Sequence, residues 1–134
     1  MTEEDRRNKN LILITFLGTI IDDYTIKAEY STNDKDIKVI VVQETSGAKE
    51  VFFGSDNPLY NYFNIEIFGD SIQEEYETAN LINDLIGQTK YIEYNNQKWQ
   101  IIFKQYTNPR AIEYYDIRRV SYTSTYQLVV NRVS

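Results

Sequence analysis

The chain has 134 residues and contains neither cysteine nor histidine. Without cysteine it has no disulfide, no thiol nucleophile and no thiolate zinc site, and its composition fits a reducing compartment. Without histidine it cannot form a Ser-His-Asp triad. Carboxylates are left as the catalytic candidates, so most of the site chemistry found in enzymes is excluded by composition alone.

Positive charge is also scarce, since 14 basic residues face 20 acidic ones and the formal net charge is −6. A polyanion-binding domain usually carries a basic excess, so tight binding of DNA or RNA is not expected. Hydrophobic residues make up 42% and charged residues 25% of the chain, which is typical of globular proteins. We predict one domain, residues 1–134, that buries roughly two-thirds of its unfolded surface.

Long hydrophobic runs are absent, and the longest candidate is Leu11–Ile21. This run is too short to cross a bilayer, and the acidic residues before it are atypical of a secretion signal. We predict a buried helix from Thr2 to about Thr19, with a strand at Leu11–Phe16 as the competing interpretation. The apolar positions at helical spacing are Leu13, Phe16, Leu17, Ile20 and Ile21.

The clearest pattern lies in the second half of the chain. Asn61–Phe68 alternates like a strand, and its apolar residues Phe63, Ile65 and Ile67 predict the face that meets the core. A helix is predicted over Ser71–Ile86, because Ser71 to Glu74 match a capping box and Gly87 is well placed to end it. Its predicted apolar stripe is Ile72, Tyr76, Ala79, Ile82 and Ile86, with Leu85 beside it.

Shorter signals fill the rest of the chain. β-Branched residues predict a strand at Ile37–Val42. A hairpin is predicted over Tyr91–Gln105, with Asn95 and Asn96 in its turn because asparagine tolerates the left-handed conformation of positive φ. Asn108 opens a predicted loop through about Asp116, and clean alternation predicts a last strand at Val120–Val133. Asp22–Asp36 is polar and turn-rich around the turn Asn33–Asp36, and Val51–Phe53 is a candidate short extended piece. The fold class predicted is α+β, with a mostly antiparallel sheet and the N-terminal and central helices on one face.

Acidic side chains are clustered, but their positions favour structural roles. Glu74, Glu75 and Glu77 fall in the first turns of the predicted helix, where acids interact favourably with the helix dipole. Asp34 and Asp36 lack the spacing of a calcium loop. We therefore expect no enzyme activity, no catalytic residue, no cofactor and no metal site.

Tyrosine is unusually common, with 12 copies. Its large apolar ring and polar tip suit half-buried sheets and subunit interfaces, and sugar or base stacking is the weaker alternative. Arginines cluster before the last strand, where they can pair with acidic groups of a neighbouring subunit or form a solvated rim. The predicted interface residues are Arg110, Tyr114, Tyr115, Arg118, Arg119, Arg6 and Arg7.

Three stretches give the chain a resemblance to a known family: Phe63–Gly69, the helix around Tyr76–Ile82, and Arg119–Leu128. Their order and spacing resemble the tail terminator (tail completion) and minor capsid proteins of long-tailed bacteriophages. The resemblance covers about two-thirds of the chain, and it is weakest over Ile26–Phe53. It rests on pattern and length, because that family has no catalytic motif.

The resemblance implies a small α+β subunit of the virion that is assembled in the host cytoplasm. It implies a ring of copies, typically a hexamer, that caps the tail tube protein and joins it to the head connector or head-closure protein. DNA would pass through this ring without specific binding, and no membrane is involved. Other interpretations stay open: another head–tail joining protein (head-closure, stopper or neck), a small tyrosine-rich binding module, and, least favoured, a carboxylate-dependent hydrolase.

Overall fold

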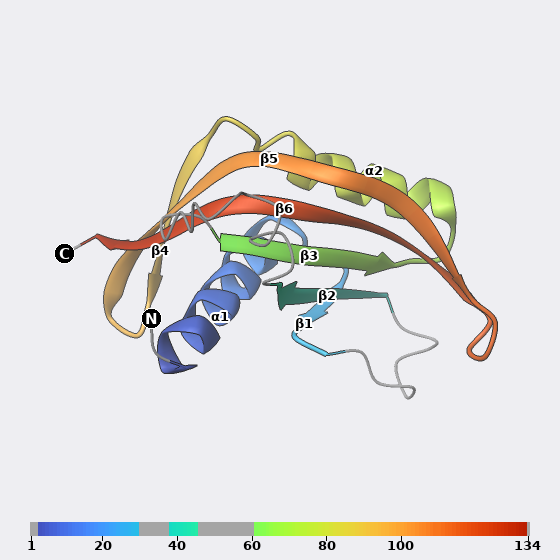
Figure 1. Cartoon of the computed structure of the whole chain (residues 1–134), viewed down its shortest axis with the longest axis horizontal. Helices are drawn as coiled ribbons and strands as arrows, with labels where there is room; N and C mark the ends of the chain where they lie inside the picture. Colours follow the sequence, from blue (N-terminus) through green and yellow to red (C-terminus); the bar gives the residue numbers. More distant parts are fainter. Residues whose placement is uncertain (1–2, 30–37, 46–60, 134) are drawn as a thin grey trace, which may run out of the picture.

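The computed structural model describes residues 3–29, 38–45 and 61–133, with side chains from residue 9 onward. The predicted turn at Asn33–Asp36 and the short piece at Val51–Phe53 lie outside the described residues. The elements are α1 (Glu3–Ile20), β1 (Thr25–Lys27), β2 (Val39–Glu44), β3 (Asn61–Phe68), α2 (Ile72–Asn83), β4 (Thr89–Tyr94), β5 (Gln97–Tyr114) and β6 (Arg119–Val133) (Figure 1).

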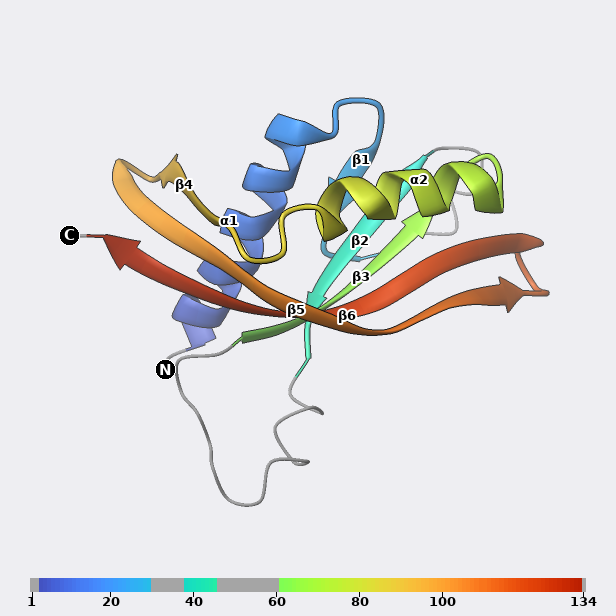
Figure 2. The ribbon, with the colours of Figure 1, turned by 90° about the horizontal axis from the view of Figure 1, so that it is seen from above.

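The strands form one curled sheet in the order β1-β2-β3-β6-β5-β4. Only β1 and β2 run parallel, and every other neighbouring pair is antiparallel. Both helices lie on the same face of this sheet (Figure 2). Helix α2 packs on β3 and β6, whereas α1 contacts β1, β2 and β4. The predicted α+β class, with a mostly antiparallel sheet, is confirmed.

Helix α1 confirms the helical interpretation of the N-terminal segment, and the alternative strand there is wrong. Its apolar residues recur at spacings of three and four, so they form one stripe that is buried against the sheet. The exception is Ile20, which is 39% exposed and so lies off the stripe that we predicted. The buried residues of this segment are Ile12, Leu13, Phe16, Leu17 and Ile21.

Helix α2 begins as the capping pattern predicts, because the Ser71 hydroxyl accepts a hydrogen bond from the Glu74 amide at 3.1 Å. The helix ends at Asn83, earlier than predicted, and single turns carry the chain on to Gly87 at φ +87°. The predicted apolar stripe is partly wrong, since Ile72 and Tyr76 are 42% and 47% exposed. The buried face comprises Glu75, Thr78, Ala79 and Ile82.

The predicted loop from Asn108 to Asp116 is wrong, because β5 continues as a strand through Tyr114. The sheet register shifts between Thr107 and Arg110, and Asn108 adopts φ +56° within this irregularity. Such a bulge accommodates Pro109, which has no amide hydrogen for a regular ladder. The ladder then resumes with Arg110 opposite Thr123. The β4–β5 hairpin, by contrast, turns at Asn95 and Asn96 in the predicted left-handed conformation.

The face of the sheet opposite the helices is polar along much of its length. Phe63, Ile65 and Ile67 belong to the main core on the helix side, as predicted. On the other side the Glu66 carboxylate accepts hydrogen bonds from the hydroxyls of Tyr114 and Ser121, both at 2.6 Å. A second, small apolar cluster forms here. Its members are Val39, Val41 and Phe68, packed against Tyr114 and Ile117.

β1 was not predicted, because the segment Asp22–Asp36 has a polar, turn-rich sequence. The three residues of β1 pair in parallel with Val39–Val41 at one end of the sheet. A strand this short has no alternation to detect and forms only because β2 offers a partner.

Candidate functional site

The arginines and tyrosines predicted before the last strand gather at one end of the β5–β6 hairpin. We call this end the hairpin tip: Tyr114, the turn of residues 115–118, and Arg119. Arg110 lies close by on β5. The tip extends beyond the N-terminal end of α2 (Figures 1 and 2). Arg6 and Arg7 lie in α1 near the opposite end of the molecule, so the structure does not bring them to the tip.

Side chains of the hairpin tip divide into exposed and anchored groups. Tyr115 is 84% exposed, and Arg118 is exposed with a left-handed backbone at φ +53°. Tyr114 is anchored by its bond to Glu66 and by its ring, whose centroid lies 5.7 Å from that of Phe68. Burial and the Glu66 carboxylate raise the pKa of Tyr114 to about 12. The guanidinium of Arg119 lies 5.2 Å from the Phe68 ring centroid.

A pocket of about 460 Å³ lies between the hairpin tip and the start of α2. We call it the Glu75 pocket. One wall is the turn between β3 and α2 together with the first turn of the helix, and the other wall is the beginning of β6. The lining residues are Gly69, Asp70, Ser71, Ile72, Glu75, Arg118, Arg119 and Val120.

Glu75 is the unusual residue of this pocket, because its side chain is only 1% exposed. Its Oε2 accepts a hydrogen bond from the Gly69 amide at 2.7 Å, whereas its Oε1 is buried and has no partner among the residues that the structure describes. Burial raises the pKa of Glu75 to about 7, although the Gly69 amide and Arg119 act in the opposite direction. Gly69 allows this close approach, since a Cβ there would lie 2.7 Å from the Tyr24 hydroxyl and 3.1 Å from Glu75 Cγ.

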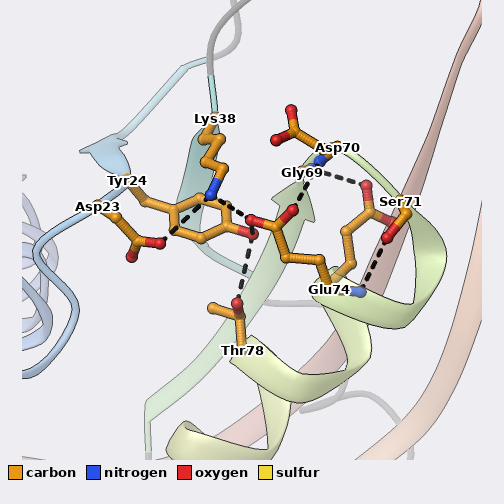
Figure 3. Close-up of polar contacts among 9 residues, drawn as sticks. Asp23, Tyr24, Lys38, Gly69, Asp70, Ser71, Glu74 and Thr78 are labelled. Carbon is orange, nitrogen blue, oxygen red and sulfur yellow. Dashed lines mark hydrogen bonds and ion pairs between the residues drawn. The ribbon is translucent and has the colours of Figure 1, made fainter.

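Glu74 precedes Glu75 on the helix, but it is partly exposed and paired with a positive charge (Figure 3). It forms a close ion pair with Lys38, which also lies 3.3 Å from an Asp23 carboxylate oxygen. The bond from Lys38 lowers the pKa of Glu74 and raises the pKa of Lys38.

The Tyr24 hydroxyl belongs to the same cluster and donates to Glu74 at 3.3 Å. It accepts a bond from Thr78 at the same distance, and burial raises the pKa of Tyr24 to about 12. This cluster ties the residue before β2 and the chain before β1 to α2.

The chemistry available here is binding, and proton exchange at the buried carboxylate of Glu75. A paired-acid hydrolase needs two carboxylates that face each other across a cleft. Glu74 is engaged by Lys38, and Asp70, the other acid of the lining, is exposed at the rim. Within residues 3–29, 38–45 and 61–133, no group of three or more acidic side chains is placed to hold a metal ion.

Reasoning from sequence placed Glu75 among ordinary helix-start acids and so missed it. The signal was its spacing, because Glu75 lies three, four and seven residues before Thr78, Ala79 and Ile82 on the buried face. Burying a carboxylate at such a position costs desolvation free energy, so it indicates a compensating interaction or a function.

Neither helix of the described part of the chain is long and apolar enough to cross a bilayer. A comparison with protein-family models and with curated protein sequences found no match to this chain. Its function therefore has to be argued from the hairpin tip, the Glu75 pocket and the resemblance of its element order.

Proposed function

We propose that this protein is a structural subunit of a bacteriophage virion that resembles a tail terminator. In this role several copies, typically six, form a ring that caps the tail tube and joins it to the head connector. The protein is not an enzyme in this proposal, and it has no cofactor. Its partners are further copies of itself, the tail tube protein and the head-closure protein, and it resides in the phage tail or neck after assembly in the host cytoplasm.

The observation that carries the proposal is the exposed outer half of the β5–β6 hairpin. β4 covers the edge of β5 only as far as Ile102, and every residue from Lys104 to Ala111 is exposed. We call β5 from Lys104 onward, together with its partner β6, the arm: β3 supports it as far as Tyr122, and beyond that residue the two strands continue to the hairpin tip without β3. Arginine and tyrosine are the residues enriched in subunit interfaces, and both occur at the end of this arm.

Features of the arm favour contacts through side chains over strand-to-strand pairing. Its outer strand contains Pro109 and two register shifts, which disturb a regular edge. Lys104 and Arg110 add charge to the same strand. Natural proteins use bulges, prolines and charges to prevent uncontrolled pairing of edge strands. A specific ring joint built from side chains is compatible with such an edge.

The charge of the chain supports the same role. A net charge of −6 on each copy gives a ring a negative field, which repels DNA and lets it pass without being held. The basic groups at the hairpin tip then have many acidic partners on neighbouring copies. Electrostatic complementarity of this kind mainly fixes the register and specificity of an interface.

The test is the native mass in solution, measured by light scattering over a range of protein concentrations and at two salt levels. We expect a species near six times the 15.9 kDa mass of the chain, with a ring visible by electron microscopy. Charge reversal at Arg110 and Arg118 should weaken this species. The matched control reverses Lys98 and Arg132, which are exposed at the opposite end of the β5–β6 pair and should leave assembly unchanged.

A monomer at every concentration would contradict self-assembly, and the same experiment with purified tail tubes then tests the related head-closure role. That alternative protein stays monomeric until it docks. A ring that survives charge reversal at both Arg110 and Arg118 would show that the joint lies elsewhere on the subunit.

One observation favours a second candidate function, a small binding module. Tyr76 and Tyr122 meet edge to face with centroids 5.7 Å apart, and Tyr76 and Tyr106 are 47% and 39% exposed. Half-exposed tyrosine rings of this kind can stack on a sugar or contact a peptide. A binding module would be monomeric and would gain thermal stability from its ligand, which a screen by thermal unfolding measures.

A further inference from the structure

The Glu75 pocket contains a hydrogen-bonding group that the described part of the chain does not satisfy. Glu75 Oε1 is buried and without a partner, although the other oxygen of the same carboxylate is bonded to Gly69. A buried polar atom left unpaired is costly, and most such atoms in folded proteins have a partner. The pocket is therefore incomplete until another group is brought to this oxygen.

The charges around the pocket decide whether it favours a cation or an anion as the additional group. Arg118 and Arg119 line one wall, and the first turn of α2, whose amides form the positive end of the helix dipole, lines the other. The positive charges of the two arginines and of the helix end disfavour a cation in the pocket and favour an anion, and Arg119 already acts to lower the pKa of Glu75.

The acidic groups nearby oppose an anion only weakly. Glu74 is paired with Lys38, and Glu66 is bonded to Tyr114 and Ser121. Asp70 is exposed at the rim, where solvent screens its charge. Glu75 itself is left, and it ceases to oppose an anion once it takes up a proton from solvent.

Protonated Glu75 is also the right partner for a carboxylate. Its Oε1–H group then donates a hydrogen bond to a carboxylate oxygen, while Oε2 keeps its bond from the Gly69 amide. The raised pKa of about 7 makes this proton uptake nearly free at neutral pH. One proton moves from solvent to Glu75 when the carboxylate binds, and no other bond is made or broken.

We propose that the Glu75 pocket receives an acidic side chain of a second copy of this protein, held by Glu75 and by Arg118. This inference rests on the proposed ring and names its joint. A second copy is the occupant that charge indicates, because the chain has 20 acidic residues against 14 basic ones. A pocket of about 460 Å³ also fits one side chain and not a helix.

Assembly measured between pH 5.5 and pH 8.5 tests the proposal. The contact needs Glu75 protonated, so assembly should be strongest below pH 7 and weaken by about tenfold per contact for each pH unit above it. The variant Glu75→Gln keeps a donor of the same size at this position and should assemble with no such pH dependence. The matched control Glu77→Gln, an exposed acid on the same helix, should behave like the original chain.

Opposite results would overturn the inference. If assembly strengthened as the pH rose, and Glu75→Gln abolished it, the pocket would bind a cation and not a carboxylate. If Glu75→Gln assembled with the same pH dependence as the original chain, the pocket would have no part in the joint.

A second arm separates failure of the joint from failure of the ring. Acetate is added to the protein under conditions where it is monomeric, and the amide resonance of Gly69 is followed by NMR. A saturable shift below pH 7 that is lost in Arg118→Asn supports a carboxylate site even if no ring forms. No shift in the original chain at any pH would overturn the site, whatever the oligomeric state.

Discussion

The two halves of the β5–β6 hairpin differ although they belong to the same pair of strands. In the inner half, Ile101, Phe103 and Leu128 are fully buried beneath the helices. In the outer half, β5 is exposed from Lys104 to Ala111, and only its partner β6 is covered. The difference follows from β4, whose first residue, Thr89, lies opposite Ile102, so that β4 does not cover the outer half. One hairpin can thus supply a core and an arm, and substitutions in its two halves should affect different properties.

The largest effect is expected from Phe103→Ala in the inner half. It removes a fully buried ring that packs 5.8 Å from the ring of Phe16, so we expect the free energy of unfolding to fall by about 3–5 kcal/mol. Tyr115→Ala at the tip should change it by less than about 0.5 kcal/mol. Urea denaturation of both variants measures this contrast, and equal effects would break the division of the hairpin.

A smaller effect, dependent on pH, is expected from Glu75→Gln beside the arm. The pKa of Glu75 is near 7 in the folded chain and near 4.5 when unfolded, so its stabilising contribution is complete below pH 4.5 and is lost as the pH rises through 7. Glutamine is never ionised, so the free energy of unfolding of the variant should exceed that of the original chain by about 3 kcal/mol at pH 8. Thermal and urea unfolding at pH 5 and pH 8 should show the gap widening with pH, and a constant gap would contradict the assigned cause.

Tyr114→Phe tests the anchor of the hairpin tip. The variant keeps the ring next to Phe68 but loses the hydrogen bond to Glu66, which still accepts from Ser121. We expect a loss of about 1 kcal/mol in the free energy of unfolding. The control Tyr91→Phe changes an exposed tyrosine of β4 and should cost less. An equal loss in both variants would mean that the tip is not anchored through Glu66.

The smallest effect on stability is expected from Arg118→Asn. Arg118 has φ +53°, and asparagine tolerates this left-handed conformation better, so the variant should gain about 0.5 kcal/mol or less. The same change removes a guanidinium from the Glu75 pocket and should weaken assembly. Denaturation and light scattering on the same sample measure the two effects, and a joint loss of both would mean that Arg118 supports the fold of its own subunit.

Sequence patterns were sufficient where local chemistry decides the structure. The Ser71 cap, the turn at Asn95 and Asn96, and the core face of β3 each depend on residues within a few positions of one another. Sequence patterns failed where pairing with a strand that is distant in the sequence decides the structure. β5 continues past Pro109 because β6 pairs with both sides of a bulge, and β1 exists only because β2 lies beside it.

The candidate site was predictable only in part for the same reason. The arginines of the hairpin tip are neighbours in sequence, so their grouping was visible. Glu75 meets Arg118 and Arg119 only after α2 has packed against β3 and β6. A pocket formed by elements this far apart leaves no local pattern, and the buried position of Glu75 on its helix was the one available signal.

The pairing of β3 with β6 sets the order in which this chain can fold. Ile65 lies opposite Ser124, so the middle of the sheet closes only when the last strand arrives. During synthesis α1, β2 and β3 leave the ribosome first, and the edge of β3 that pairs with β6 stays uncovered until β6 follows. Contacts of such long sequence separation slow folding and favour aggregation in the interval. Chaperone demand during expression should thus be highest just before β6 emerges.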